Sequence, residues 1–151
     1  MKINELKNLL KHLKSDIIFN ADVKKKNWFN IGGKAKIFFK PTELKDLIEF
    51  LKLLNNREKI HVIGAGSNTL ITDELFDGVI IKLGKNFNHL SKLSTDIIIS
   101  GAAVTDKKLS EFAAENNLSG FEFLSCIPGT VGGGIKMNAG CFGNEIKDIL
   151  L

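Results

Sequence analysis

Arginine, cysteine and long apolar runs are scarce in this 151-residue sequence, and each scarcity excludes a class of protein. Arg57 is the one arginine among 21 basic residues, and the lysines are dispersed along the chain. Specific base readout favours arginine forks, and single-strand platforms interleave basic residues with aromatic ones. Neither pattern is present. The net charge of +4 therefore predicts solvated lysines, including the run Lys24-Lys25-Lys26, and no nucleic-acid partner.

The two cysteines, Cys126 and Cys141, form no cluster of metal-ligand spacing with the three histidines, so no metal site is expected. The N-terminal residues open an amphipathic helix and lack the apolar core of a signal peptide. No apolar run reaches membrane-spanning length. These features predict a cytoplasmic protein with no membrane contact and two free thiols, because a reducing compartment disfavours disulfides.

The apolar pattern predicts a mixed α and β chain, and this length can bury roughly 70% of the unfolded surface without disulfides. Apolar residues at helical spacing predict helices at residues 3–13, at 44–54 with Thr42 as cap, and after a cap at Thr105. β-Branched runs predict strands at residues 35–39, 60–63, 79–83 and 97–100.

A glycine-rich loop, Gly64-Ala65-Gly66-Ser67-Asn68, follows the strand predicted at residues 60–63. Its two glycines permit positive φ, so successive backbone N–H groups can form a nest for a diphosphate, and its serine and asparagine add side-chain donors. The loop is not a Rossmann fingerprint, because Thr69 stands where a third glycine would fall and no long helix follows. A tight structural turn is the alternative interpretation.

A second glycine-rich stretch, IPGTVGGG at residues 127–134, leads into Met137-Asn138-Ala139-Gly140. Six of the 14 glycines fall within fifteen residues here, which predicts a loop of bare main chain. Such a loop can lie against a flat ring system or a diphosphate, with Thr130 and Asn138 offering hydrogen bonds. A purely structural role is the alternative, but two such loops together favour an elongated nucleotide ligand.

Four blocks of the sequence resemble the UDP-N-acetylenolpyruvoylglucosamine reductase family, in the family's order. They are Asn27-Trp28-Phe29-Asn30-Ile31-Gly32-Gly33, the loop 64–68 with Asp77-Gly78, Gly120-Phe121-Glu122-Phe123, and the most specific block, residues 127–143. The resemblance implies an α+β FAD-binding fold of the vanillyl-alcohol-oxidase (PCMH) type, in two subdomains, truncated before the substrate-binding domain. Residues 1–24 would form a helix and linker, 25–84 the first subdomain, and 85–151 an incomplete second subdomain.

The resemblance also implies a cofactor and a reaction, the NADPH-dependent reduction of an enolpyruvyl UDP-sugar to UDP-N-acetylmuramate for peptidoglycan. The FAD diphosphate would lie at Gly64, Ala65, Gly66, Ser67 and Asn68. The rest of the cofactor would lie at Ile127, Pro128, Gly129, Thr130, Gly132, Gly133, Asn138, Ala139 and Gly140. The family's catalytic arginine, serine and glutamate lie downstream of these residues, so no catalytic residue is expected before Leu151.

We expect a chain of this extent to bind FAD weakly or not at all and to show no NADPH-dependent turnover. The UDP-sugar would be a partner only with the substrate-binding domain present. The apolar end Ile149-Leu150-Leu151 looks like an interrupted strand, and missing parts of the fold would leave apolar surface exposed. Aggregation, or pairing with a downstream fragment, is therefore expected.

Small departures from the family pattern are Trp28, where threonine is usual, and Cys126, where we expect a buried and inert thiol. Two other functions remain open. One is a different FAD-linked oxidase or dehydrogenase of the same superfamily, which covalent flavin attachment would favour. The other is a noncatalytic nucleotide-binding module, to which ADP would bind as well as FAD.

Overall fold

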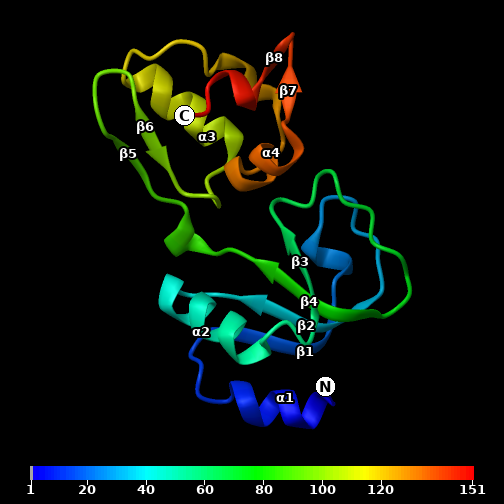
Figure 1. Ribbon diagram of the computed structural model, residues 1–151. Coiled ribbons are helices and arrows are strands. Elements are labelled where there is room, and N and C mark those ends of the chain that lie inside the picture. The colour runs from blue at the N-terminus through cyan, green and yellow to red at the C-terminus, as the bar shows by residue number, and fades with distance from the viewer. Residues whose placement is uncertain (1) are drawn as a thin grey trace. The chain divides into compact units, whose positions relative to one another are not determined.

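The computed structural model describes residues 2–151, and the chain divides into two compact units, the first ending at Gly84 and the second spanning Lys85–Leu151 (Figure 1). The α-helices are α1 (Ile3–Leu10), α2 (Leu44–Leu54), α3 (Asp106–Glu115) and α4 (Val131–Met137). The strands of the first unit are β1 (Asp16–Asp22), β2 (Lys34–Lys40), β3 (Lys59–Ile63) and β4 (Phe76–Lys82). Those of the second are β5 (Leu90–Lys92), β6 (Ile98–Ser100), β7 (Gly140–Cys141) and β8 (Asn144–Glu145).

The first unit is built on a four-stranded sheet with the order β1-β2-β4-β3. β1 pairs antiparallel with β2, whereas β2, β4 and β3 run parallel. Five consecutive residues of β2, from Ala35 to Phe39, are buried. Such an unbroken buried run is typical of a central strand that is covered on both faces.

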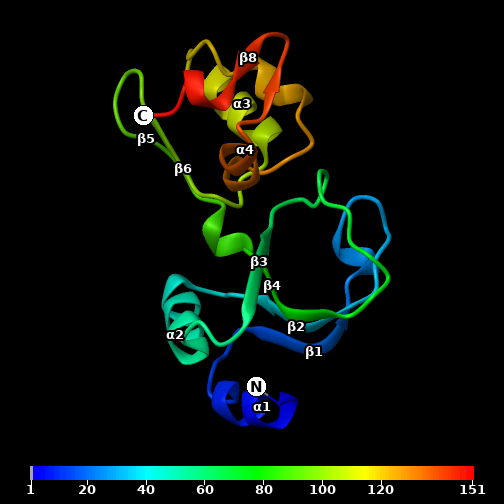
Figure 2. The same ribbon diagram turned by 45° about the vertical axis from the view of Figure 1, so that its right-hand side comes forward.

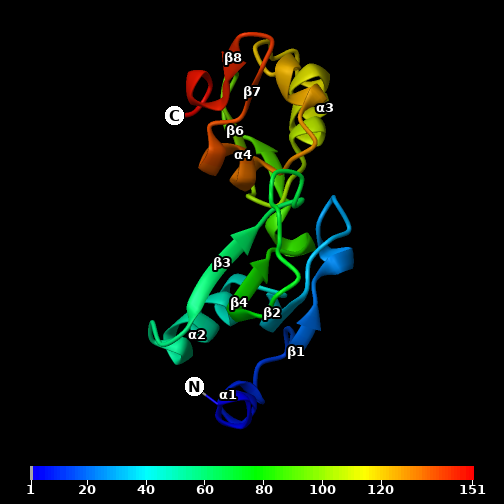
Figure 3. The same cartoon turned by 90° about the vertical axis from the view of Figure 1, so that its right-hand side faces the viewer.

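One face of this sheet is covered by the two helices α1 and α2, which the views in Figures 1 and 3 both place there. Phe50 of α2 stacks on Phe39 of β2 with ring centroids 3.8 Å apart. α2 ends at Asn55, which adopts the left-handed conformation that commonly terminates helices. The helical spacing of apolar residues therefore predicted this layer. Its fully buried members are Leu6, Leu10, Ile37, Phe39, Phe50, Leu54, Val79 and Ile81.

The opposite face of the sheet is covered by irregular chain, and this is the side that carries the candidate site (Figure 2). Its buried side chains are Ala21, Val23, Ala35, Phe38, Ile63 and Ile80, with Ile71 and Phe76 packed against them. A short 3-10 helix, Lys24–Lys26, and the loops at residues 27–33 and 64–75 lie next to this cluster in sequence. Loops held on a rigid sheet are a common place for binding groups.

The second unit packs α3 and α4 with two short hairpins, β5-β6 and β7-β8. The Thr105 side chain accepts a hydrogen bond from the Lys108 N–H and caps α3, as the sequence predicted. Short 3-10 helices at Lys85–Phe87, Glu122–Cys126 and Ile146–Asp148 complete the unit. Its core consists of Val104, Leu109, Phe123, Leu124, Val131 and Ile146.

Three local expectations are wrong. Residues 16–22, expected in a linker, form β1. The strand begins and ends with polar residues and is mostly exposed or half-buried, so its sequence did not predict a strand. The N-cap of α2 is Glu43 rather than Thr42. Residues 131–137, expected in a loop, form α4, because the Thr130 side chain accepts from the Gly133 N–H and starts a helix despite three glycines. Over residues 2–151, no helix is long and apolar enough to cross a membrane.

Candidate functional site

The carboxyl ends of three parallel strands lie side by side in the sheet of the first unit. β2 ends at Lys40, β4 ends at Lys82, and β3 ends at Ile63, opposite Lys82 in the register. The glycine-rich loop 64–68 leaves the sheet at these strand ends. In sheets of parallel strands, ligands bind outside the carboxyl ends of the strands.

The main chain of the loop 64–68 offers unused donors. Throughout the part of the chain that the structure describes, the N–H groups of Ala65, Gly66, Ser67 and Asn68 donate no hydrogen bond. Gly66 adopts φ +75°, a conformation that L side chains rarely adopt, and it is buried. Ala65 and Ser67 are half-buried and Asn68 is exposed. Backbone amides that are buried without an acceptor are costly, so the amides of residues 65–67 are suited to an anion.

The loop is fixed from the other side by the block that begins at Asn27. A Cβ on Gly66 would lie 2.9 Å from both the Cα and the Cβ of Asn27, and the Trp28 N–H donates to the Gly66 carbonyl at 3.2 Å. Asn27 is itself buried, and its amide donates to the carbonyls of Val23 (3.0 Å) and Ile31 (2.7 Å). Only glycine at position 66 permits this close approach, so the loop is held in shape before any ligand arrives.

Positive charge gathers on the same side of the sheet. The Lys82 Nζ donates to the Lys26 carbonyl at 3.1 Å, and the Lys26 ammonium lies 5.2 Å from the centre of the Phe38 ring. Burial lowers the pKa of Lys82 below its usual value, and the charges of Lys26 and Lys40 lower it further. Mutual repulsion of this kind is relieved by a bound anion. The run Lys24-Lys25-Lys26 is thus more than a solvated stretch, because Lys26 belongs to this cluster.

The glycine-rich stretch of the second unit differs, because most of its amides are bonded within the unit. The N–H groups of Val131 and Gly132 donate to the carbonyls of Val104 (2.9 Å) and Ala102 (3.0 Å). The Gly134 N–H donates to the Thr130 carbonyl at 2.7 Å. These donors are satisfied within the unit and do not form a second phosphate nest.

Close packing accounts for three of the four glycines between residues 129 and 134. A Cβ on Gly129 would collide with the Asp106 carboxyl, and one on Gly134 would collide with the Ile146 side chain. A Cβ on Gly132 would lie 2.9 Å from the Ala102 Cβ. Gly133 is the exception, since the Thr130 hydroxyl at 3.3 Å is its one near neighbour. The glycines of this segment are therefore explained mainly by packing within the unit.

The Asn138 side chain, expected to face a cofactor, is engaged within the second unit. Its amide donates to the Glu145 carboxylate at 3.0 Å, and its oxygen accepts from the Lys147 N–H at 3.1 Å. The Ala139 N–H donates to the Gly134 carbonyl at 2.9 Å. These bonds attach the β7-β8 hairpin to the end of α4, so residues 138–140 hold the segment in place.

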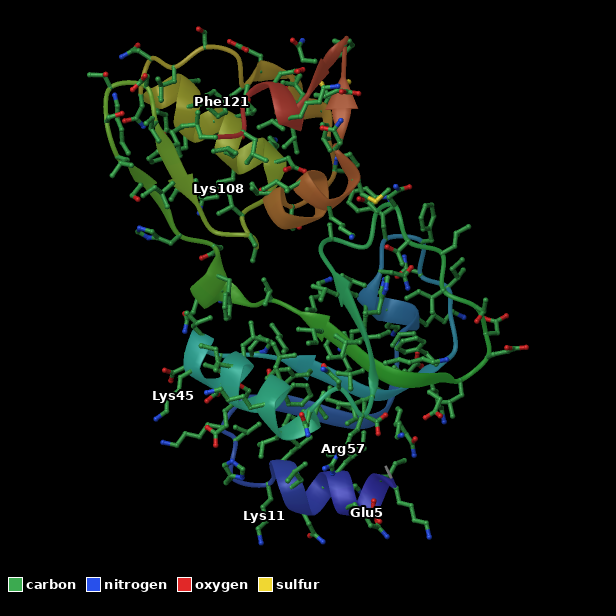
Figure 4. All side chains as sticks on the ribbon, in the orientation of Figure 1. Glu5, Lys11, Lys45, Arg57, Lys108 and Phe121 are labelled. Atoms are coloured by element: carbon green, nitrogen blue, oxygen red, sulfur yellow. The ribbon has the colours of Figure 1, made fainter. Side chains whose placement is uncertain are left out.

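A buried acid lies directly beneath the glycines of the second unit. Asp106 is fully buried, and neither of its carboxylate oxygens has a hydrogen-bond partner in the described chain. Burial raises the pKa of this carboxyl to about 6. Asp106 lines a half-open cavity of about 470 Å³ together with apolar side chains that include Phe121 and Leu124, the former labelled in Figure 4. Among the described residues, this carboxyl is the one buried side-chain group whose oxygens have no hydrogen-bond partner. Its ionisation should therefore change the stability of the second unit.

The Cys126 thiol is exposed, so the expectation of a buried thiol is wrong. Phe123 and Leu124 fill the core side of the 3-10 helix Glu122–Cys126 and leave its end outside. Cys141 is half-buried, and both cysteines are free. Over residues 2–151, no group of three His, Cys, Asp or Glu side chains is placed to hold a metal ion.

Comparison with known proteins identifies the class. Residues 35–151 match the family model described as FAD binding domain, and the chain belongs to this family. Its relatives include the UDP-N-acetylenolpyruvoylglucosamine reductase of Pelagibacter ubique (strain HTCC1062), 60% identical over the whole of this chain and 50% of that protein. The reductase of the same name from Rickettsia akari (strain Hartford) is 43% identical over 95% of this chain and 48% of that protein.

Solved structures agree with this assignment. The crystal structure of UDP-N-acetylenolpyruvylglucosamine reductase from Thermus caldophilus matches with a TM-score of 0.69 and 28% identity, over 89% of this chain and 46% of that one. p-Cresol methylhydroxylase matches with a TM-score of 0.50 and 17% identity, over 76% of this chain and 24% of that one, which shows the fold alone. The resemblance and the FAD-binding fold expected from the sequence are confirmed. The chain spans about half the length of the curated relatives it matches.

Sequence reasoning missed Asn27 as the organiser of the loop, and it missed Lys82. An asparagine in a polar stretch gives no signal of burial, because its bonds are to the carbonyls of residues up to four positions away. Lys82 could have been found, because a lysine that ends an apolar strand next to a glycine-rich loop is a recognisable pattern once the strands are known to be parallel.

Proposed function

We propose that this chain is the FAD-binding part of the NADPH-dependent reductase that converts UDP-N-acetylglucosamine enolpyruvate to UDP-N-acetylmuramate in peptidoglycan synthesis. The observation that carries the proposal is the loop 64–68, whose amides lack acceptors, in a chain 60% identical to a reductase of that name. The flavin would supply the hydride. This chain's residues would bind the cofactor and orient it.

The two units would contribute differently to the cofactor. Gly64, Ala65, Gly66, Ser67 and Asn68 would bind the diphosphate through main-chain donors and side-chain tips. Residues 127–134 and 138–140 would line the remaining part mainly by contact, because most of their main-chain donors are bonded within the unit. The residues for proton transfer and for binding the UDP-sugar would come from the half of the relatives that this chain does not span. The proposed setting is the cytoplasm.

FAD titration of the purified chain tests this proposal through its only tryptophan. Trp28 is 60% exposed, and its backbone N–H donates a hydrogen bond to the Gly66 carbonyl of the loop. We expect weak, saturable quenching of Trp28 fluorescence by FAD, since flavins absorb where tryptophan emits. Added NADPH should give no turnover of the enolpyruvyl UDP-sugar.

The competing outcomes are distinct. Competition by ADP that displaces FAD as effectively as FAD itself binds, with no yellow protein isolated, would favour a plain nucleotide-binding module. Robust turnover by the 151-residue chain would contradict the division of labour proposed here. Supplying the remaining half of the Pelagibacter ubique relative as a separate chain should raise FAD affinity if the two halves associate.

A further inference from the structure

The cationic cluster at the carboxyl ends of the parallel strands consists of Lys26, Lys40 and Lys82. Over residues 2–151, no ion pair involves Lys26, Lys40 or Lys82. Three positive charges held together without a carboxylate in an ion pair oppose one another. A bound anionic ligand would offset the repulsion among these three ammonium groups.

Lys82 is the member of the cluster that the structure positions most firmly. It ends β4 and lies opposite Ile63, the residue directly before the loop 64–68. One of its three N–H donors is bonded to the Lys26 carbonyl, which leaves two for a ligand. Lys40 differs, because Asp16 of β1 stands opposite it in the sheet register.

Lys26 is tied to the same place by a second route. Its carbonyl accepts a hydrogen bond from the Lys82 ammonium, and the next residue, Asn27, packs against Gly66. The loop donors, the Lys82 ammonium and the Lys26 segment are therefore held together by bonds within one unit. Neutral amides and ammonium groups in one place match a diphosphate better than a carboxylate or a single phosphate, because a diphosphate carries more charge and more acceptors.

We propose that Lys82 and Lys26 form the cationic side of the site in which the amides of Ala65–Asn68 receive a nucleotide diphosphate. This inference rests on the proposed function, because the diphosphate would be that of FAD. It adds two charged ligands at positions that carry no glycine-loop signature. It also explains why Lys82 is partly buried at a strand end where a solvated lysine would be expected to extend into water.

The test compares inorganic pyrophosphate and FAD as ligands for matched lysine variants of the full chain. Lys82→Met should weaken binding of both ligands about tenfold or more and should flatten the dependence of affinity on salt. Lys82→Arg should retain most of the affinity, because it keeps the charge. Lys59→Met is the control. Lys59 is exposed and begins β3, at the end of the strand away from the loop 64–68, so this substitution should leave both affinities unchanged.

Each outcome decides the inference. Wild-type affinity for FAD and pyrophosphate in Lys82→Met would overturn it and leave the proposed function standing. If the wild-type chain bound pyrophosphate through Lys82 but bound no FAD at any concentration, even with the remaining half of the Pelagibacter ubique relative supplied, the cationic site would stand and the proposed function would fall. Should Lys82→Met fail to fold, Lys26→Met decides, because that ammonium lies over Phe38 and holds no backbone carbonyl. An unchanged pyrophosphate affinity there would also overturn the inference.

Discussion

Gly66→Ala should abolish or weaken FAD binding at least about tenfold while the rest of the first unit stays folded. The added methyl group meets two obstacles. Position 66 has φ +75°, which costs an alanine roughly 1–2 kcal/mol. The new Cβ would also lie 2.9 Å from the Asn27 Cα, which cannot yield without breaking the bonds of Asn27 to Val23 and Ile31. The loop must therefore move away, and its aligned donors are lost. Fluorescence titration with FAD measures the effect.

Gly120→Ala is the matched control for this experiment. Gly120 has φ +91°, but no atom lies within 4 Å of a Cβ built there. The control thus carries the backbone strain without the collision, in the other unit. Circular dichroism of both variants separates loss of binding from loss of fold. Wild-type FAD affinity in a folded Gly66→Ala variant would contradict the role given to the loop.

Asp106→Asn should stabilise the protein increasingly as pH rises from about 4 to 7. The pKa of Asp106 is raised by burial from an ordinary value of 3.8 to about 6. An acid with a higher pKa in the folded state binds its proton more tightly there. The stability it contributes is therefore complete below pH 3.8 and is lost as pH rises through about 6. The loss amounts to roughly 3 kcal/mol at neutral pH. Asparagine has nearly the same shape and cannot ionise, so it avoids this loss.

Urea unfolding followed by circular dichroism between pH 4 and 8 measures this difference. The free energy of unfolding of Asp106→Asn, relative to the original chain, should grow by roughly 2–3 kcal/mol over that range. Asp96→Asn serves as a control, because Asp96 is exposed and its carboxylate accepts from the Ser94 hydroxyl. A pH-independent difference would show that the Asp106 carboxyl is not the buried acid described.

The sequence predicted those parts of the fold that local patterns determine. The apolar spacing of α2 and the cap of α3 at Thr105 both appear where expected. β1 was missed because its own sequence pattern does not predict a strand, and its backbone pairing with β2 stabilises it instead. α4 was missed because three glycines oppose a helix locally, and the close approach of Ala102 to Gly132 and of Ile146 to Gly134 explains only two of them.

In the candidate site, too, the sequence predicted what depends on local pattern and missed what depends on contacts with distant residues. Among the residues that the structure describes, the N–H groups of residues 65–68 donate no hydrogen bond, as a glycine-rich nest after a strand would suggest. The stretch 127–134 looked alike in sequence, yet its donors bond to Val104 and Ala102, which lie more than twenty residues earlier. Glycine content shows that backbone must come close to something. It does not show whether that something is a ligand or the protein's own chain.

Amide chemical shifts of the ¹⁵N-labelled chain during a titration with FAD test the central claim most directly. We predict that the amide protons of Ala65, Gly66, Ser67 and Asn68 move downfield together, because they gain charged phosphate acceptors that they lack in the free protein. Saturable FAD binding that leaves these four amides in place would contradict the claim.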